Sequence, residues 1–275
     1  MIASLEDRTM AWSPEATAIM RRIVASADTD ILILNAPIER PRDRRLIKLL
    51  TTRACRENLL MILVTNGGDP DVAYRIARCI QNHYTKFTVC VSGVCKSAGT
   101  LLLLGANELA FSEHGEIGPL DIQMAKKDDL WESESGLTVI TALAALSENA
   151  QDAFDHFLLS LTARSGGRIT VRTASEIAAK LTQALYAPIA EQIDPIHMGE
   201  VKRSMAIAKQ YGERLLKKSE LCDAERLNIL ISGYPSHSFV IDREEAKDMF
   251  KQDAVRDCTE DELALLEDID NFALL

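Results

Sequence analysis

One serine in this chain stands where an apolar run gives way to a leucine-rich helical pattern. Ser97 follows the run Lys86–Val94 and precedes Ala98 and Gly99. A serine at the start of a helix lies among backbone N–H groups that favour negative charge. Such a serine can attack a carbonyl carbon while neighbouring N–H groups hold the oxyanion. The spacing therefore indicates nucleophilic catalysis, with an ordinary helix cap as the alternative.

A second sharp turn stands one apolar run earlier. Asn66–Gly67–Gly68–Asp69 follows the run Asn58–Thr65. The carboxyl ends of adjacent parallel strands share one edge of a sheet, so both turns are expected to direct N–H groups into one crevice. The two glycines are not a phosphate-binding loop, because no Gly-Lys-Ser/Thr sequence follows them. Together the turns favour a site that stabilises an oxyanion.

The elements that must position these turns alternate in type. Asp69 with Pro70 is a typical helix start. The alternation of strands and helices predicts parallel strands with right-handed crossovers. The predicted strands are Asp30–Asn35, Asn58–Thr65, Lys86–Val94 and Glu108–Ser112, and the predicted helices are Arg42–Thr52, Asp71–Gln81 and Ser97–Gly105.

Beyond Thr138 the pattern becomes mainly helical. Long amphipathic stretches predict helices over Val139–Ser160 and Met198–Leu216. The remaining expectations are a break at Gly166–Gly167, a capping box of Thr173 and Glu176, a strand at Asn228–Ser232, and a short helix capped by Asp242 with Glu245. We expect an N-terminal segment (1–29), an α/β domain (30–252, helical from about 138) and an acidic C-terminal tail (253–275) that forms a peripheral helix.

Composition narrows the class of protein. The chain has 275 residues and a formal net charge of -10, which does not favour a nucleic-acid partner. No apolar stretch approaches the roughly 20 residues of a transmembrane helix, and the N-terminus does not read as a secretion signal. The six cysteines lack metal-ligand spacing and are expected to be reduced and mostly buried. These features predict a cytoplasmic protein, and we expect no metal or other bound cofactor.

Several short motifs stand in a fixed order at close spacing. They are Thr65–Asn66–Gly67–Gly68, Lys96–Ser97–Ala98–Gly99–Thr100, Gly118–Pro119–Leu120–Asp121, Ile193–Asp194–Pro195 with Gly199–Glu200, and the stretch from Tyr234 to Ile241. This ordered set resembles the Clp-protease/crotonase superfamily, and within it the serine dehydrogenase proteinase family, which is related to signal peptide peptidase A. The resemblance covers roughly Asp30 to Lys247.

The resemblance implies a fold and a site. The fold would be a Clp-protease/crotonase-like repeated ββα core with a helical C-terminal half, assembled as a homo-oligomer of three or more chains. Ser97 matches the nucleophile, and the N–H groups of Gly68 and Ala98 match the oxyanion hole. The sequence departs from the Clp proteases at the base, because their histidine aligns near Leu120 or Asp121 here.

The group that would accept the serine proton stays open between several candidates. His114 lies just after the fourth predicted strand, and His237 lies in the family-like stretch. A histidine accepts a proton near pH 7 without a pKa shift, so histidine is favoured over lysine. His114 is preferred because that strand returns toward the edge that carries Ser97. The other candidates are Lys126, Lys127 and Lys96, with Lys96 expected to point away, while Asp121 could orient a histidine.

The function predicted from the sequence is a serine hydrolase. We expect an ATP-independent peptidase or proteinase that acts on a peptide or protein substrate. The alternatives are a crotonase-like acyl-thioester enzyme that uses the same oxyanion hole without covalent catalysis, and an inactive oligomeric scaffold.

Overall fold

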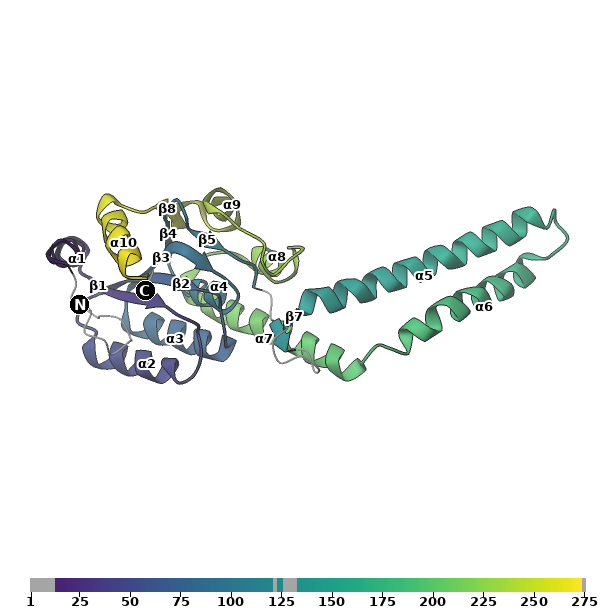
Figure 1. The fold of residues 1–275 in the computed structure, drawn as a ribbon, viewed down its shortest axis with the longest axis horizontal. Helices are drawn as coiled ribbons and strands as arrows, with labels where there is room; N and C mark the ends of the chain where they lie inside the picture. The colour runs from purple at the N-terminus through teal and green to yellow at the C-terminus, as the bar shows by residue number, and fades with distance from the viewer. Residues whose placement is uncertain (1–12, 121–122, 126–132, 274–275) are drawn as a thin grey trace. The chain divides into compact units, whose positions relative to one another are not determined.

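The structure is a computed structural model that describes residues 13–120, 123–125 and 133–273. It divides into two compact units (Figure 1). The first unit contains residues 1–123 and 205–275, and the second contains residues 124–204. Both ends of the described chain belong to the first unit.

The first unit is built on a parallel sheet. Its strands lie in the order β1-β2-β3-β4-β8, and β5 pairs with the end of β3. The helices α2, α3 and α4 connect the first four strands in turn, which confirms the expected α/β class. The strands are β1 (Thr29–Asn35), β2 (Asn58–Thr65), β3 (Lys86–Cys95), β4 (Glu108–Phe111), β5 (Glu116–Ile117) and β8 (Val255–Asp257), and the helices are α2 (Arg42–Arg53), α3 (Pro70–His83) and α4 (Ala98–Leu103).

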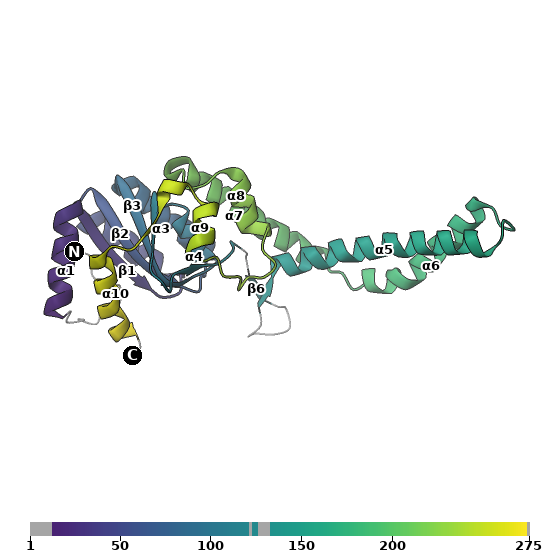
Figure 2. The same cartoon turned by 90° about the horizontal axis from the view of Figure 1, so that it is seen from above.

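Successive side chains of the strands enter two separate apolar clusters. On β1, Leu32 and Leu34 belong to one cluster, while Ile31 and Ile33 belong to the other. This alternation is the two-residue period of a strand that is covered on both faces. The helices α1 (Pro14–Ala27) and α10 (Glu260–Ala273) lie side by side against the second cluster (Figure 2). Neither α1 nor β8 was predicted from the sequence.

The remaining helices of this part of the chain include one correction. They are α7 (Pro195–Ser219), α8 (Ala224–Ser232) and α9 (Arg243–Met249), followed by the 3-10 turn η1 (Gln252–Ala254). The predicted strand at Asn228–Ser232 is the second half of α8. Asp223 caps this helix by accepting the Arg226 N–H, and Leu227, Leu230 and Ile231 are buried at helical spacing. The predicted cap at Asp242, which accepts the Glu245 N–H, is confirmed.

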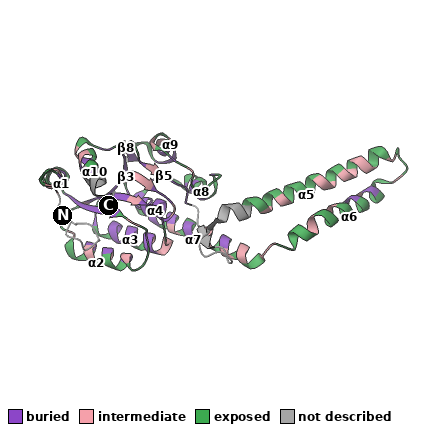
Figure 3. Cartoon of the chain, in the orientation of Figure 1, coloured by how far each residue is buried: buried purple, intermediate pink, exposed green. Residues whose placement is uncertain are grey.

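The second unit contains two long helices, α5 (Gly136–Arg164) and α6 (Val171–Ala190), and the short strands β6 (Gln123–Ala125) and β7 (Ser133–Ser135). Gly166 and Gly167 have positive φ and separate the helices, as expected. The helix cap is Thr170, whose hydroxyl accepts the Thr173 N–H, so the predicted box at Thr173 was three residues late. Most described side chains of α5 and α6 are half-buried or exposed (Figure 3).

Within the described ranges, every helix is too short or too polar to cross a bilayer.

Candidate active site

The turns after β2 and β3 lie against each other. The strands are paired up to Thr65 and Cys95, and the Lys96 N–H donates to the Thr65 carbonyl at 3.0 Å. A Cβ atom placed on Gly67 would lie 2.8 Å from the Cβ of Ser97, which is closer than real side chains approach. The two turns that were expected to share one edge are therefore in direct contact.

The turn after β2 presents backbone rather than side chains. Gly67 and Gly68 have φ values of +108° and +141°, which side chains rarely adopt. The Gly67 carbonyl accepts the Ile38 N–H at 2.8 Å, and the Ile38 carbonyl accepts the Asp69 N–H at 2.7 Å. Ile38 thus bonds to the residues before and after Gly68, and the N–H of Gly68 itself faces away from Ile38. Gly68 is exposed. This N–H is available to a ligand.

The side chain of Thr65 stabilises the same turn. It is buried, and its hydroxyl accepts the Gly67 N–H at 3.1 Å. Its methyl group would lie 2.5 Å from a Cβ placed on Gly99, so α4 can begin here only because residue 99 is glycine. One threonine therefore fixes both turns. The sequence analysis missed it, although a polar residue that ends an apolar strand next to two glycines is a usable signal.

The turn after β3 carries the serine. Ser97 has φ +53° and ψ -113°, it is half-exposed, and its side chain makes no capping hydrogen bond to α4. An ordinary N-cap has extended backbone angles and accepts an N–H of its helix, so Ser97 is not an ordinary cap. A strained backbone at a sharp strand-to-helix turn is also the geometry that exposes the nucleophilic serine of α/β-hydrolases.

Two N–H groups border this serine. Ala98 is the first residue of α4, and the first N–H groups of a helix have no acceptor within it. Within the described part of the chain, neither the Ala98 N–H nor the Gly68 N–H donates to a backbone or side-chain acceptor. The Ala98 nitrogen would lie 3.3 Å from a Cβ placed on Gly67. The geometry suits the oxyanion hole that the sequence predicts, and that assignment stays a prediction.

A neighbouring thiol does not compete with Ser97 as a nucleophile. Cys95, two residues before the serine, is fully buried. Burial raises the pKa of its thiol well above the usual value, so Cys95 stays protonated at neutral pH. All six cysteines are free, and five of them are buried, as expected.

The structure does not bring His114 to Ser97. His114 is exposed in the turn between β4 and β5. In this turn the Ser112 hydroxyl donates to the Ser92 carbonyl at 3.2 Å, and β5 pairs with β3 only from Val94 onward. The turn therefore lies beside Ser92, five residues before Ser97.

The turn that carries His237 is hydrogen-bonded to the residue before the serine. His237 is half-buried, and the Phe239 N–H closes its turn on the Ser236 carbonyl at 3.1 Å. The ammonium group of Lys96, the residue before Ser97, donates to the carbonyls of Ser238 and Phe239 at 3.3 and 3.1 Å. This geometry favours His237 over His114, the reverse of the sequence-based preference.

The other predicted residues divide into two groups. Lys96 is buried, and its ammonium group lies 2.9 Å from Glu116 Oε1. Asp121, Lys126 and Lys127 lie outside the described residues.

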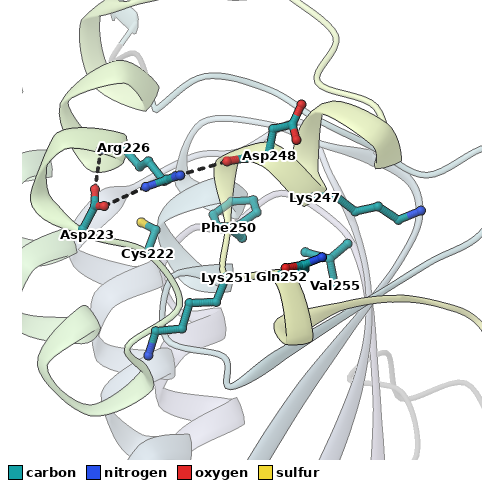
Figure 4. Close-up of a pocket in the computed structure, with 9 residues that line it drawn as sticks. All are labelled: Cys222, Asp223, Arg226, Lys247, Asp248, Phe250, Lys251, Gln252 and Val255. Atoms are coloured by element: carbon teal, nitrogen blue, oxygen red, sulfur yellow. Dashed lines mark hydrogen bonds and ion pairs between the residues drawn. The ribbon is translucent and has the colours of Figure 1, made fainter.

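A surface hollow elsewhere in the α/β unit lacks the features of a reactive site. Its volume is about 760 Å³, and its lining includes Val255, the first residue of β8 (Figure 4). It is therefore at the amino end of that strand, whereas Ser97 follows the carboxyl end of β3. Its three cations are paired: Arg226 with Asp223, Lys247 with Glu244, and Lys251 with Glu220. Among the described residues, no cluster could hold a metal ion.

Comparisons with known proteins gave structural likeness only. No protein-family model and no curated protein matches the sequence. Two similar solved structures are mutants of the 1510-N membrane-bound stomatin-specific protease. The lysine-to-alanine mutant, in complex with a substrate peptide, covers 86% of this chain and 77% of its own, with 14% identity and a TM-score of 0.47. The serine-to-alanine mutant covers 57% and 75%, with 17% identity and a TM-score of 0.32.

Proposed function

We propose that the protein is a serine hydrolase, and specifically a cytoplasmic, ATP-independent peptidase. Ser97 attacks the acyl carbon, and the N–H groups of Gly68 and Ala98 stabilise the tetrahedral oxyanion. The observation that carries the proposal is the backbone of Ser97, with φ +53° and no capping role, in contact with Gly67. The ordered motifs shared with the serine dehydrogenase proteinase family support the same assignment.

His237 is proposed as the general base, with Asp121 as a group that orients it. A base must come within hydrogen-bond reach of the serine in the productive complex. The turn of His237 is held by the residue next to Ser97, whereas His114 lies beside Ser92. When the tetrahedral intermediate collapses, the scissile C–N bond breaks and the leaving amine takes the proton that His237 received from Ser97. Water, deprotonated by the same base, then attacks the acyl enzyme, and Ser97 leaves with the proton returned by His237.

A fluorophosphonate probe tests the nucleophile. Wild-type protein should be labelled at Ser97, as located by mass spectrometry of a digest. Ser97→Ala should lose all labelling at that peptide, and Ser92→Ala, on the same strand, should keep it. Labelling that persists in Ser97→Ala would remove this serine from the mechanism. Absence of labelling in folded wild-type protein would instead favour the thioester enzyme or the inactive scaffold.

The pH dependence of the labelling rate tests the base. His237→Gln should lower the rate near neutral pH by about 10²–10⁴-fold and remove the inflection of the profile. His114→Gln should leave both unchanged. If the two variants behave in the opposite way, His114 is the base. If neither changes the profile, no histidine serves as the base.

We also propose that the chain forms a homo-oligomer through the helices α5 and α6. Ile177, Leu181, Leu185 and Ile189 recur every four residues on α6 and are 37–55% exposed. The buried residues of this helix are two alanines, so the second unit has almost no core of its own. Uncovered apolar stripes of this kind mark contact surfaces.

Charge on the same two helices favours a second copy of this chain as the partner. Arg164, Arg168 and Arg172 are exposed around the α5–α6 connection, and Glu148 and Asp152 are exposed farther back on α5. The basic end of one hairpin can therefore face the acidic stretch of a neighbouring hairpin in the assembly. Opposite charges across an interface fix its register.

Light scattering after size-exclusion chromatography measures the mass of the assembly. Wild-type protein should elute as three or more chains at micromolar concentration. The double variant Leu181→Glu/Leu185→Glu should dissociate. Gln183→Glu, which places one negative charge at an exposed polar position of the same helix, should not. A monomeric wild-type protein, or an intact oligomer of the double variant, contradicts this interface.

A further inference from the structure

A buried lysine stands directly before the nucleophile. Lys96 is 8% exposed, and its ammonium group lies 2.9 Å from Glu116 Oε1. It also donates to the carbonyls of Ser238 at 3.3 Å and Phe239 at 3.1 Å. An ammonium group has three N–H donors, and here each of the three has an acceptor.

These three contacts join segments that are far apart in the sequence. Lys96 follows β3, Glu116 begins β5, and Ser238 and Phe239 belong to the turn of His237. The lysine therefore connects the chain beside the nucleophile to the turn that carries the proposed base.

The side chain of Lys96 is confined by its neighbours. A Cβ atom placed on Gly118 would overlap the Cδ of Lys96, so the absence of a side chain at position 118 makes room for the lysine stem. Removing an ammonium group from water is unfavourable unless its donors are satisfied. Packing alone does not require a charged side chain here, because an aliphatic side chain of similar length would fill the same space. The three hydrogen-bond acceptors around the ammonium group explain why position 96 carries a lysine.

One further set of bonds supports the same turn from its other end. Ile117 and Ile241 exchange two backbone hydrogen bonds, at 3.0 and 2.9 Å. These bonds anchor the chain after the turn, whereas Lys96 anchors the turn itself. The Lys96 contacts thus join the segment between Ser236 and Ile241 to the residue before Ser97.

We propose that Lys96 is a positioning residue that holds the His237 turn in register with Ser97 and so sets the rate at which the serine loses its proton. This inference rests on the proposed serine hydrolase function. Lys96 does not touch the substrate and remains charged throughout the reaction. Its effect passes through His237, because a displacement of about 1 Å in a catalytic group can lower a rate by about 10²-fold.

The test compares ion pairs at the two ends of β3. Lys96→Met removes the charge and keeps most of the stem. Lys86→Met removes the matched pair at the start of the same strand, where Lys86 Nζ lies 2.5 Å from Glu108 Oε2. Two properties are measured in full-length protein: the fluorophosphonate labelling rate against pH, and amide hydrogen exchange of residues 236–241.

Lys96→Met should lower the labelling rate at least 10-fold, remove the inflection near neutral pH, and speed exchange at 236–241. Lys86→Met should change none of these. Lys96→Arg, which keeps a charge, should recover part of the rate. If Lys96→Met leaves the labelling profile unchanged, the inference is wrong, even if exchange becomes faster.

A double variant separates positioning from general damage. If Lys96 acts through His237, Lys96→Met/His237→Gln should be no slower than His237→Gln alone, whereas independent effects would multiply and contradict the inference. If Lys96→Met does not fold, Glu116→Gln tests the same ion pair. It should change the pH dependence of the labelling rate in the same direction but by a smaller amount. A wild-type protein that is never labelled at Ser97 refutes the proposed function, and the exchange measurement still reports whether Lys96 holds the turn.

Discussion

The turns after β2 and β3 occupy equivalent places in the sheet and are built in opposite ways. The first uses Gly67 and Gly68 and exposes backbone, and the second places the Ser97 side chain outward on strained backbone. In the first turn a side chain would collide with Ile38, and in the second a side chain is held at φ +53°. The turn after β2 is therefore suited to supply backbone N–H donors, and the turn after β3 is suited to present a reactive side chain.

Both turns depend on a rigid support. They extend the paired strands β2 and β3, whose apolar residues are buried on both faces of the sheet. Backbone strain of about 1–3 kcal/mol per residue persists only where surrounding structure enforces it. The sheet enforces the strained backbone at both turns. Substitutions at the two turns should therefore change the free energy of unfolding by different amounts and in opposite directions.

The largest effect on stability is expected for a side chain in the first turn. Gly68→Ala places a Cβ against the Ile38 carbonyl at φ +141°, so it should lower the free energy of unfolding by more than about 3 kcal/mol. Gly93→Ala is the control, because a Cβ there meets only Val64 methyl groups at 3.8 Å. It should change the unfolding free energy by less than about 1 kcal/mol. Equal urea midpoints for the two variants would contradict this reading of the first turn.

This result also bears on how the oxyanion hole can be tested. Gly68→Val would place a larger side chain against the same Ile38 carbonyl. Loss of the fold is therefore the expected outcome, so Gly68 variants cannot isolate the N–H donor.

At the edge of the sheet formed by β8, ion pairs stabilise the structure. Arg256 on β8 donates to Glu108 at 2.6 Å and to both oxygens of Glu262 at 2.7 and 2.8 Å. Burial would raise the pKa of Glu262, but hydrogen bonds from Arg256 and Thr259 outweigh it and leave the pKa below the usual 4.5. The pKa of Glu108 is lowered too, because its bonds to Lys86 and Arg256 outweigh burial.

A lowered carboxyl pKa has a defined consequence for stability. Its contribution is present above pH 4.5 and is lost as pH falls through the lowered pKa of the folded state. Arg256→Met should therefore cost about 2 kcal/mol at pH 7, and the difference from wild type should shrink below pH 4. Arg243→Met, which breaks an exposed pair with Asp257, should cost much less. A constant difference between pH 7 and pH 3.5 in urea unfolding would argue against the ion-pair account.

Local signals in the sequence were enough for most of the α/β unit. Apolar runs located β1, β2 and β3 within a residue or two, and Asp69 and Asp242 marked helix starts because their carboxylates accept N–H groups nearby. The two turns of the site followed from the same reasoning, since each comes directly after a strand.

Expectations failed where distant contacts decide the outcome. The apolar stretch at Asn228–Ser232 suits a strand or a helix, and packing selected the helix. The preference for His114 assumes that β4 returns directly to the site; β5 instead continues the pairing with β3 and places the His114 turn beside Ser92, and the identity of the base stays a prediction. The contacts of Lys96 with Ser238 and Phe239 span more than 140 positions, which no local pattern encodes.

The smallest effect concerns the strain at the second turn, and its sign is the test. Ser97→Gly removes the Cβ that disfavours φ +53°, so it should raise the free energy of unfolding by about 1 kcal/mol. The serine makes no capping bond to α4 that would be lost. Ser92→Gly, on the same strand at negative φ, should lower stability by about 0.5–1 kcal/mol, because glycine loses more freedom on folding. Near the melting temperature, 1 kcal/mol corresponds to a shift of about 2–4 °C for a chain of this size, which calorimetry resolves. If both glycine variants lower the melting temperature equally, Ser97 is not strained, and the observation that carries the nucleophile assignment is lost.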